Sequence, residues 1–148
     1  MTTTAYRTSI RSQASAIVAG GIAGLGGGVV FGMLMAMMGM LPMIAMLVRS
    51  QNPFVGFIVH MVISAGIGGF YGLVAGRLPK TAGTAIVAGA ANGMVWWVLG
   101  ALILMPLFLG MTQMILQVGQ TQWFSLMGHM IYGVVTGLLF IPLSKRLL

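Results

Sequence analysis

The stretch Gly56–Gly72, GFIVHMVISAGIGGFYG, decides the fold, because it is an apolar segment dotted with glycines that carries one histidine. Its length is close to the ~20 residues that a helix needs to cross the hydrocarbon core of a bilayer. A second stretch, 124–140, FSLMGHMIYGVVTGLLF, has the same character and carries the other histidine of the chain. The two stretches predict two membrane helices, with His60 and His129 at comparable places.

The composition extends this interpretation to the whole chain, 1–148, as a single integral membrane domain. The chain is 59% hydrophobic and 5% charged, with a mean hydropathy of +1.05, which is typical of membrane proteins. It has no Asp, Glu or Cys, so carboxylate acid–base catalysis, hard-cation sites and thiolate sites are excluded within the chain. We therefore expect no enzyme. Its few basic residues border the apolar runs, which favours lipid headgroups over nucleic acid as their partners.

Long apolar runs broken by proline, glycine and polar residues predict an all-α protein with four transmembrane helices. Pro42 and Gly39 interrupt the first run, and Pro53 suits the first turn of the second helix. The polar start, 1–13, is predicted to be a cytoplasmic arm. The predicted spans are about 15–38, 53–76, 84–105 and 123–141, with short interfacial segments at about 43–48 and 111–117.

The distribution of basic residues predicts the orientation. Four spans place both termini and the 77–80 connector on one side of the membrane. That side holds six of the seven basic residues, and the other side holds only Arg49. By the positive-inside rule we expect both termini in the cytoplasm and the protein in the inner (plasma) membrane of a prokaryote. The six are Arg7, Arg11, Arg77, Lys80, Lys145 and Arg146.

An offset of 69 residues relates the two halves of the sequence. The motif AIVAG occurs at 16–20 and again at 85–89, and the pair His-Met at 60–61 recurs at 129–130. We interpret this as a tandem two-helix repeat. Because each unit has an even number of spans, the halves would be related by a pseudo-two-fold axis along the membrane normal.

Small residues spaced four apart form a stripe on three of the predicted helices. Such stripes allow helix backbones to approach closely in lipid, so each stripe should face the interior of the bundle. Both histidines lie on a stripe and should therefore face inward. The stripes are Gly20, Gly24, Gly28, Gly32 and Ala36; Gly56, His60, Ser64, Gly68 and Gly72; and Ser125, His129, Gly133 and Gly137.

Two inward histidines at matched depth favour axial ligation of one haem b, or of a related tetrapyrrole, for electron transfer. Bis-imidazole ligation needs two neutral rings on facing helices and small neighbours beside a flat macrocycle. Ser64, Gly56 and Gly133, one turn from a histidine, would provide that space. The predicted haem-iron ligands are His60 and His129.

Other interpretations remain open at this stage. In one alternative the histidines serve only as interhelical hydrogen-bonding groups in a cofactor-free structural or assembly subunit. In another they handle a metal or protons. Met33, Met37 and Met40 share a helical face and could provide thioether ligands for Cu(I). In each case we expect other membrane subunits, or further copies of the chain, as partners.

Four stretches carry a resemblance to a known family. They are MGMLPMIAMLV at 38–48, FIVHMVIS at 57–64, MVWWVLGALILMP at 94–106 and GHMIYGVVTGLL at 128–139. The chain resembles small prokaryotic four-span membrane proteins over most of residues 14–141. The resemblance implies the four-helix fold and implies no activity or site residue.

Overall fold

The computed structural model describes residues 3–147, and the side chains from residue 12 onward. Within this part every regular element is helical, and four helical segments are long and apolar enough to cross a membrane. The chain is therefore an all-helical protein compatible with several membrane passes. The candidate spans are Ser12–Met37, Pro53–Ala75, Ala82–Phe108 and Gln120–Leu147.

The elements follow one another with short connections. Asn52 caps the second long helix, because its side-chain oxygen accepts from the Phe54 N–H at 2.9 Å. Thr81 caps the third in the same way through the Thr84 N–H. The bounds are α1 Thr3–Met37, α2 Leu41–Ala45, η1 Met46–Val48, α3 Pro53–Ala75, α4 Ala82–Trp96, η2 Trp97–Leu104, α5 Met105–Phe108, η3 Thr112–Met114 and α6 Gln120–Leu147.

Two helices extend beyond the lengths expected from the sequence. α1 begins at Thr3 instead of about residue 15, because no proline or glycine interrupts the chain before Gly20. α6 continues past Ile141 through Pro142 to Leu147. Pro142 removes one backbone hydrogen bond, the one to the Leu138 carbonyl, and the Ser144 hydroxyl in the following turn donates to the Ile141 carbonyl at 3.0 Å.

The third span changes its hydrogen-bonding pattern halfway along. α4 gives way at Trp97 to the π-helical segment η2, and α5 continues the same rod to Phe108. The third span therefore ends at Phe108, about one turn later than the expected end at about residue 105. Pro106 is tolerated here because the i→i+5 hydrogen bonding of the π-helical segment already leaves some backbone groups without a partner in the helix.

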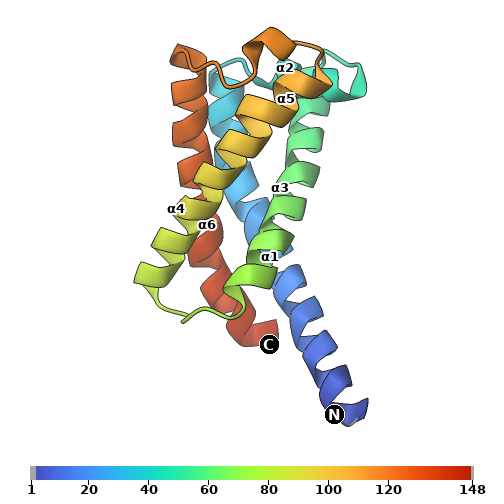
Figure 1. Ribbon diagram of the computed structural model, residues 1–148, viewed down its shortest axis with the longest axis vertical. Coiled ribbons are helices and arrows are strands. Elements are labelled where there is room, and N and C mark those ends of the chain that lie inside the picture. The colour runs from blue at the N-terminus through green and yellow to red at the C-terminus, as the bar shows by residue number, and fades with distance from the viewer. Residues whose placement is uncertain (1–2, 148) are drawn as a thin grey trace.

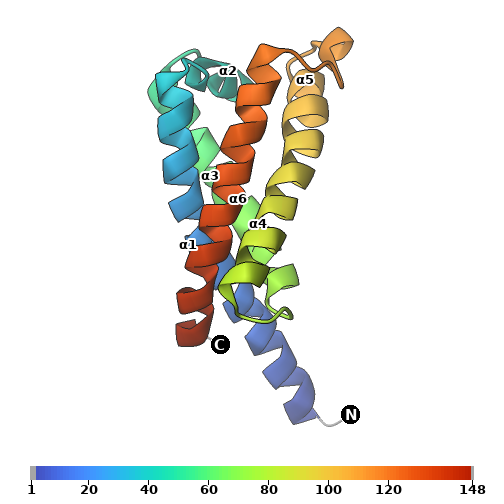
Figure 2. The ribbon, with the colours of Figure 1, turned by 90° about the vertical axis from the view of Figure 1, so that its left-hand side faces the viewer.

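The long helices form two hairpins that meet through α1 and α6. α3 packs along α1, α4 packs along α6, and α1 packs against α6, whereas α3 and α4 touch at only a few residues. Both termini and the α3–α4 connector lie at one end, and α2, α5 and η3 lie at the other (Figures 1 and 2). The bundle is thus closed on the α1/α6 side and open on the α3/α4 side.

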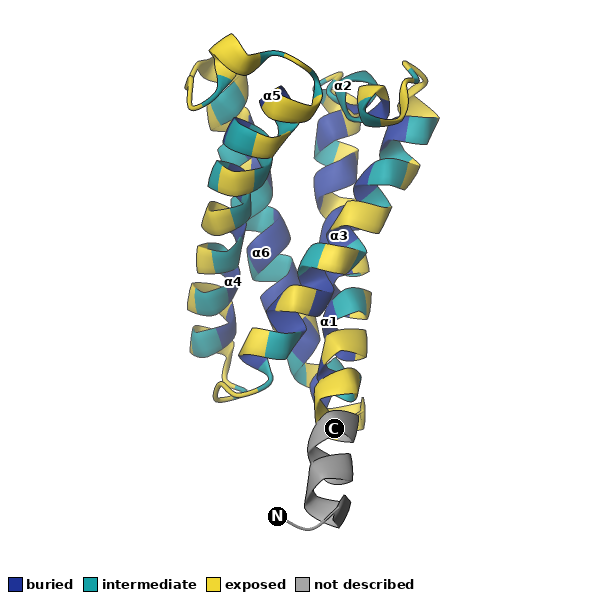
Figure 3. Cartoon of the chain, turned by 45° about the vertical axis from the view of Figure 1, so that its right-hand side comes forward, coloured by how far each residue is buried: buried dark blue, intermediate teal, exposed yellow. Residues whose placement is uncertain are grey.

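Glycines bring the backbones together within each hairpin. A Cβ atom at Gly68 would overlap the Gly20 carbonyl oxygen and lie 2.6 Å from the Gly24 Cα. A Cβ atom at Gly133 would overlap the Gly89 carbonyl oxygen and lie 3.0 Å from the Gly93 nitrogen. We call these contacts the α1/α3 seam and the α4/α6 seam. The inner faces that they bury are seen in Figure 3.

Lys80 closes the end of the α3/α4 side that lies near the termini. Its ammonium group donates to the carbonyls of Ala75, Gly76 and Leu78 at 2.8, 2.9 and 3.1 Å. The same nitrogen lies 5.2 Å from the centre of the Phe140 ring on α6. Desolvation lowers the pKa of Lys80 below its ordinary value, yet the three carbonyls and the ring satisfy the charge.

Candidate functional site

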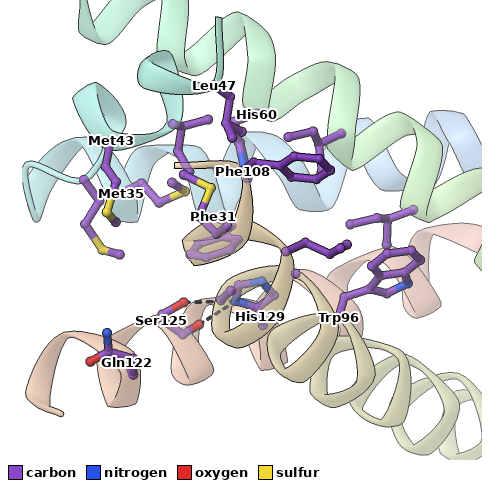
Figure 4. A pocket seen from close by; sticks show the side chains of 18 of the residues that line it. Phe31, Met35, Met43, Leu47, His60, Trp96, Phe108, Gln122, Ser125 and His129 are labelled. Atoms are coloured by element: carbon purple, nitrogen blue, oxygen red, sulfur yellow. Dashed lines mark hydrogen bonds between the residues drawn. The ribbon is translucent and has the colours of Figure 1, made fainter. Parts of the chain in front are cut away.

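A cavity lies between the two hairpins, at the end of the bundle that carries α2 and α5. Its volume is about 450 Å³, within the range of pockets that hold small ligands. Side chains from both hairpins and from α2 and α5 line it (Figure 4). Among the described lining residues none is charged.

The walls formed by α3 and α4 are thin. Gly66 on α3 and Gly100 in η2 both line the cavity, and a Cβ atom on either would meet nothing within 4 Å. Ile63, Gly66 and Phe108 line the cavity and are also exposed on the outside of the bundle. These residues belong to candidate membrane spans, so this is the side of the cavity that would face lipid in a membrane.

The π-helical segment shapes the α4 side of the cavity. Pro106 has no N–H to donate to the Leu102 carbonyl four residues before it, and the Leu116 N–H donates to that carbonyl instead, at 3.0 Å. The Trp97 indole N–H donates to the Gln122 carbonyl at 3.0 Å. These bonds fasten the connector after α5 and the start of α6 to η2. π-helical segments are frequently found at functional sites.

One face of α6 supplies most of the polar groups. Gln122, Ser125 and His129 line the cavity at spacings of three and four residues, which places them on one side of the helix. A ring nitrogen of His129, Nδ1, lies 2.8 Å from the Ser125 carbonyl oxygen. The Gln122 side-chain oxygen accepts from the Gly119 N–H at 3.0 Å. The cavity is therefore apolar with one polar stripe.

His60 also lines the cavity, but its ring is bonded to α1. It is 7% exposed, and its Nε2 donates to the Gly28 carbonyl at 3.0 Å. The ring of Phe31, on α1, lies between the two histidines, with its centre 5.3 Å from that of His60 and 4.9 Å from that of His129. Gly128 leaves room for this ring, because a Cβ atom there would overlap it.

This arrangement does not fit a haem held by both histidines. Bis-imidazole ligation needs an unprotonated nitrogen from each ring aimed at a shared iron, and because Nε2 of His60 donates to a carbonyl of α1, only its Nδ1 could be a ligand. α1 lies between α3 and α6, and Phe31 occupies the space that the macrocycle would need. Two histidines on helices with matched stripes are thus separated by a third helix.

The small residues that were expected to flank the macrocycle have other neighbours. Gly56 is packed against the backbone of Leu41 in α2, and Gly133 against that of Gly89 in α4. The Ser64 hydroxyl lies 3.4 Å from Nε2 of His60, and the Ser64 carbonyl accepts from the Tyr132 hydroxyl at 2.7 Å. The space beside these residues is filled by helix backbone.

The methionines expected to form a Cu(I) path do not converge on one site. Met33 and Met37 are 61% and 78% exposed on the outer surface of α1, whereas Met40 lines the cavity. No cluster of three or more His, Cys, Asp or Glu side chains suited to a metal occurs among the residues described. Flexible thioether side chains are common in the walls of sites that adapt to apolar ligands, and Met35 and Met43 also line this cavity (Figure 4).

Comparisons of the chain with family models, with curated proteins and with solved structures give no match. The resemblance to small four-span membrane proteins therefore stays a prediction.

Three residues that define the site are not evident from the sequence. Phe31 belongs to an apolar helix whose sequence does not distinguish it from its neighbours. Its contact with the histidine rings arises only because α1 packs between α3 and α6. Gly66 and Gly100 did carry a signal, because neither belongs to a stripe of small residues that contacts another helix. A glycine that is off the packing face leaves unfilled space, and here that space is the cavity.

Proposed function

We propose that this chain is a non-enzymatic integral membrane protein that holds an apolar, lipid-borne ligand between its two hairpins. The observation that carries the proposal is an uncharged cavity of about 450 Å³, lined by residues of α3 and η2, in a bundle where α3 and α4 scarcely touch. Cavities between helices of a bundle are common ligand sites. Participation in a larger membrane complex, or in a homo-oligomer, stays a prediction.

The packing on the two sides of the bundle supports this function. In lipid, helices associate through close van der Waals contact, and the seams achieve this with glycines. On the α3/α4 side, a Cβ atom at Gly66 or Gly100 would meet nothing within 4 Å, so close packing is absent next to the cavity. A lipid chain entering there would contact Ile63, Gly66 and Gly100, and it would leave the bulk bilayer without meeting a charge.

The seams also support the proposed tandem repeat. Gly20 and Gly24 in the first hairpin correspond, at the offset of 69, to Gly89 and Gly93 in the second, and all four contact the backbone of the other helix in their hairpin. The repeat would have lost its symmetry where α1 meets α6 closely while α3 and α4 remain apart. The cavity is the result of that asymmetry.

Charge placement supports cytoplasmic termini. Arg77, Lys80, Lys145 and Arg146 belong to the end of the bundle that holds the C-terminus, and Arg49 belongs to the end with α2 (Figure 1). The side chains of Arg7 and Arg11 lie outside those described. The positive-inside rule then places the cavity in the outer half of an inner membrane.

Filling the cavity tests the proposal. Wild-type protein, Gly100→Phe and the matched control Gly83→Phe would be purified in nanodiscs formed directly from cell membranes. Bound lipids that survive detergent washing would be quantified by mass spectrometry. Gly83 is exposed at the start of α4, and a Cβ atom there also meets nothing within 4 Å, so both variants add a ring in open space.

We expect wild type and Gly83→Phe to retain about one neutral lipid species per protein, and Gly100→Phe to lose most of it. Equal retention by all three proteins, or retention of no species above the bulk lipid composition, would overturn the proposal. Circular dichroism and thermal unfolding of each variant would show that all three remain folded.

A further inference from the structure

We infer that the ligand has an uncharged head group with a hydroxyl, and that this hydroxyl donates a hydrogen bond to Nε2 of His129. The inference rests on the proposed function and specifies the chemistry of the molecule that the cavity takes. It follows from the protonation of one ring, from the space next to that ring, and from the absence of charge among the described lining residues.

The hydrogen bond to Ser125 determines which nitrogen of His129 carries the proton. A backbone carbonyl can only accept, so Nδ1, at 2.8 Å from the Ser125 carbonyl oxygen, must be the donor. In a neutral imidazole the other nitrogen, Nε2, is then an acceptor. The chain has no Asp or Glu to pair with a charged ring, and an unpaired charge inside a bilayer is costly.

Nε2 of His129 is free to receive a ligand. No hydrogen bond between described residues reaches it, and it is not one of the enclosed polar atoms that lack a partner, which are Asn92 Nδ2, Trp96 Nε1 and Thr136 Oγ1. His129 lines the cavity, and the proposal places this unpartnered nitrogen toward it. Nδ1 faces Ser125 on the same helix (Figure 4), so the opposite edge of the ring faces away from its own helix.

The lining excludes charged head groups. A phosphate or carboxylate in this cavity would lie beside apolar side chains with no cation among the described lining residues, and burying such a charge costs far more than one hydrogen bond returns. An uncharged hydroxyl loses little free energy on entering the cavity, because a hydrogen bond to His129 replaces its hydrogen bond to water. Phospholipids and ionised fatty acids are therefore disfavoured.

Two membrane sources provide this chemistry, namely isoprenoid quinols and lipid alcohols such as diacylglycerol. For a quinol the acceptor at Nε2 also predicts a preference for redox state. The oxidised quinone has no hydroxyl, so it cannot donate a hydrogen bond to Nε2. We therefore expect the reduced form to bind more tightly than the oxidised form.

The test measures retention of matched probes by the full chain. Wild type, His129→Phe, His129→Gln, Gly100→Phe and Gly83→Phe would be incorporated into nanodiscs that contain one probe at a low molar fraction. The probes are decylubiquinol and decylubiquinone, dioctanoylglycerol and its methyl ether, and phosphatidic acid. Probe retained per protein after washing would be measured by mass spectrometry.

Wild type should retain a hydroxyl probe about tenfold better than its partner without the donor, the factor that one net hydrogen bond supplies. This preference should vanish in His129→Phe and return in part in His129→Gln, which again offers an acceptor. A preference for the quinol over the quinone would identify the quinone pool as the source, and a preference for dioctanoylglycerol over its ether would identify glycerolipids.

Other results separate the two proposals. If probes with and without the donor are retained equally and Gly100→Phe removes both, the cavity binds lipid but the head-group inference is wrong. Stronger retention of phosphatidic acid would also overturn it. If Gly100→Phe retains every probe as well as Gly83→Phe does, the proposed function itself is wrong. The comparison of probes on wild type needs no substitution, so misfolding of a variant would not obscure the result.

Discussion

Glycine has opposite effects in the seams and in the cavity. At Gly68, in the α1/α3 seam, the missing side chain lets two helix backbones touch. Gly66 lies two positions earlier on the same helix. There the missing side chain leaves empty space, because a Cβ atom would have no neighbour within 4 Å. Glycine therefore gives close packing on one face of α3 and part of the cavity lining on the other.

The difference arises from what lies opposite each face. α1 presents Gly20 and Gly24 to Gly68, so both backbones can approach. α4 presents its π-helical segment to Gly66, and the two helices scarcely meet there. Farther along, the hairpins are joined by the contact between the rings of Phe70 and Trp96, whose centres are 6.1 Å apart, and by the Lys80 ammonium group, which lies over the Phe140 ring of α6. Function is expected where the packing is incomplete.

The largest effect is expected in the seams. In Gly68→Ala the added methyl group would overlap the backbone of α1, and the helices would have to separate, so the free energy of unfolding should fall by about 2–3 kcal/mol. Gly133→Ala should have a similar effect in the α4/α6 seam. Reversible unfolding in mixed micelles would measure both, and values within a few tenths of wild type would show that the seams are loose.

A smaller effect is expected at Lys80, which closes the α3/α4 side at the end away from the cavity. Lys80→Met keeps the apolar stem but removes the donor to three carbonyls and the charge over Phe140. We expect a loss of about 1 kcal/mol. Hydrogen exchange of the last turn of α3 should rise more than that of α2, and equal protection at both ends would contradict this assignment.

The pH dependence at this position has a definite sign. Desolvation lowers the pKa of Lys80 in the folded protein, so the unfolded chain binds more protons between the folded and the ordinary pKa. The contribution of Lys80 to stability should therefore increase as the pH rises through that window, and it should be absent in Lys80→Met. A wild-type-like slope in the variant would assign the dependence to another group.

The smallest effect is expected at Gly66, with the opposite sign. Gly66→Ala adds a methyl group to open space and lowers the entropy of the unfolded chain, so the free energy of unfolding should rise by about 0.5–1 kcal/mol. Measured beside Gly68→Ala, it compares two faces of one helix. Destabilisation by both substitutions would show that the cavity is closed around Gly66.

The sequence by itself determined the approximate places of the four long apolar helices, which are compatible with a membrane protein, and the inward position of His60, because hydropathy and small-residue spacing are properties of each segment alone. Only the tertiary structure decided how the hairpins meet. It placed Phe31 between the histidines, turned Met33 and Met37 outward and left α3 apart from α4. These outcomes depend on contacts between helices distant in the chain. Stripe spacing shows which face packs, and it does not show which helix packs against that face.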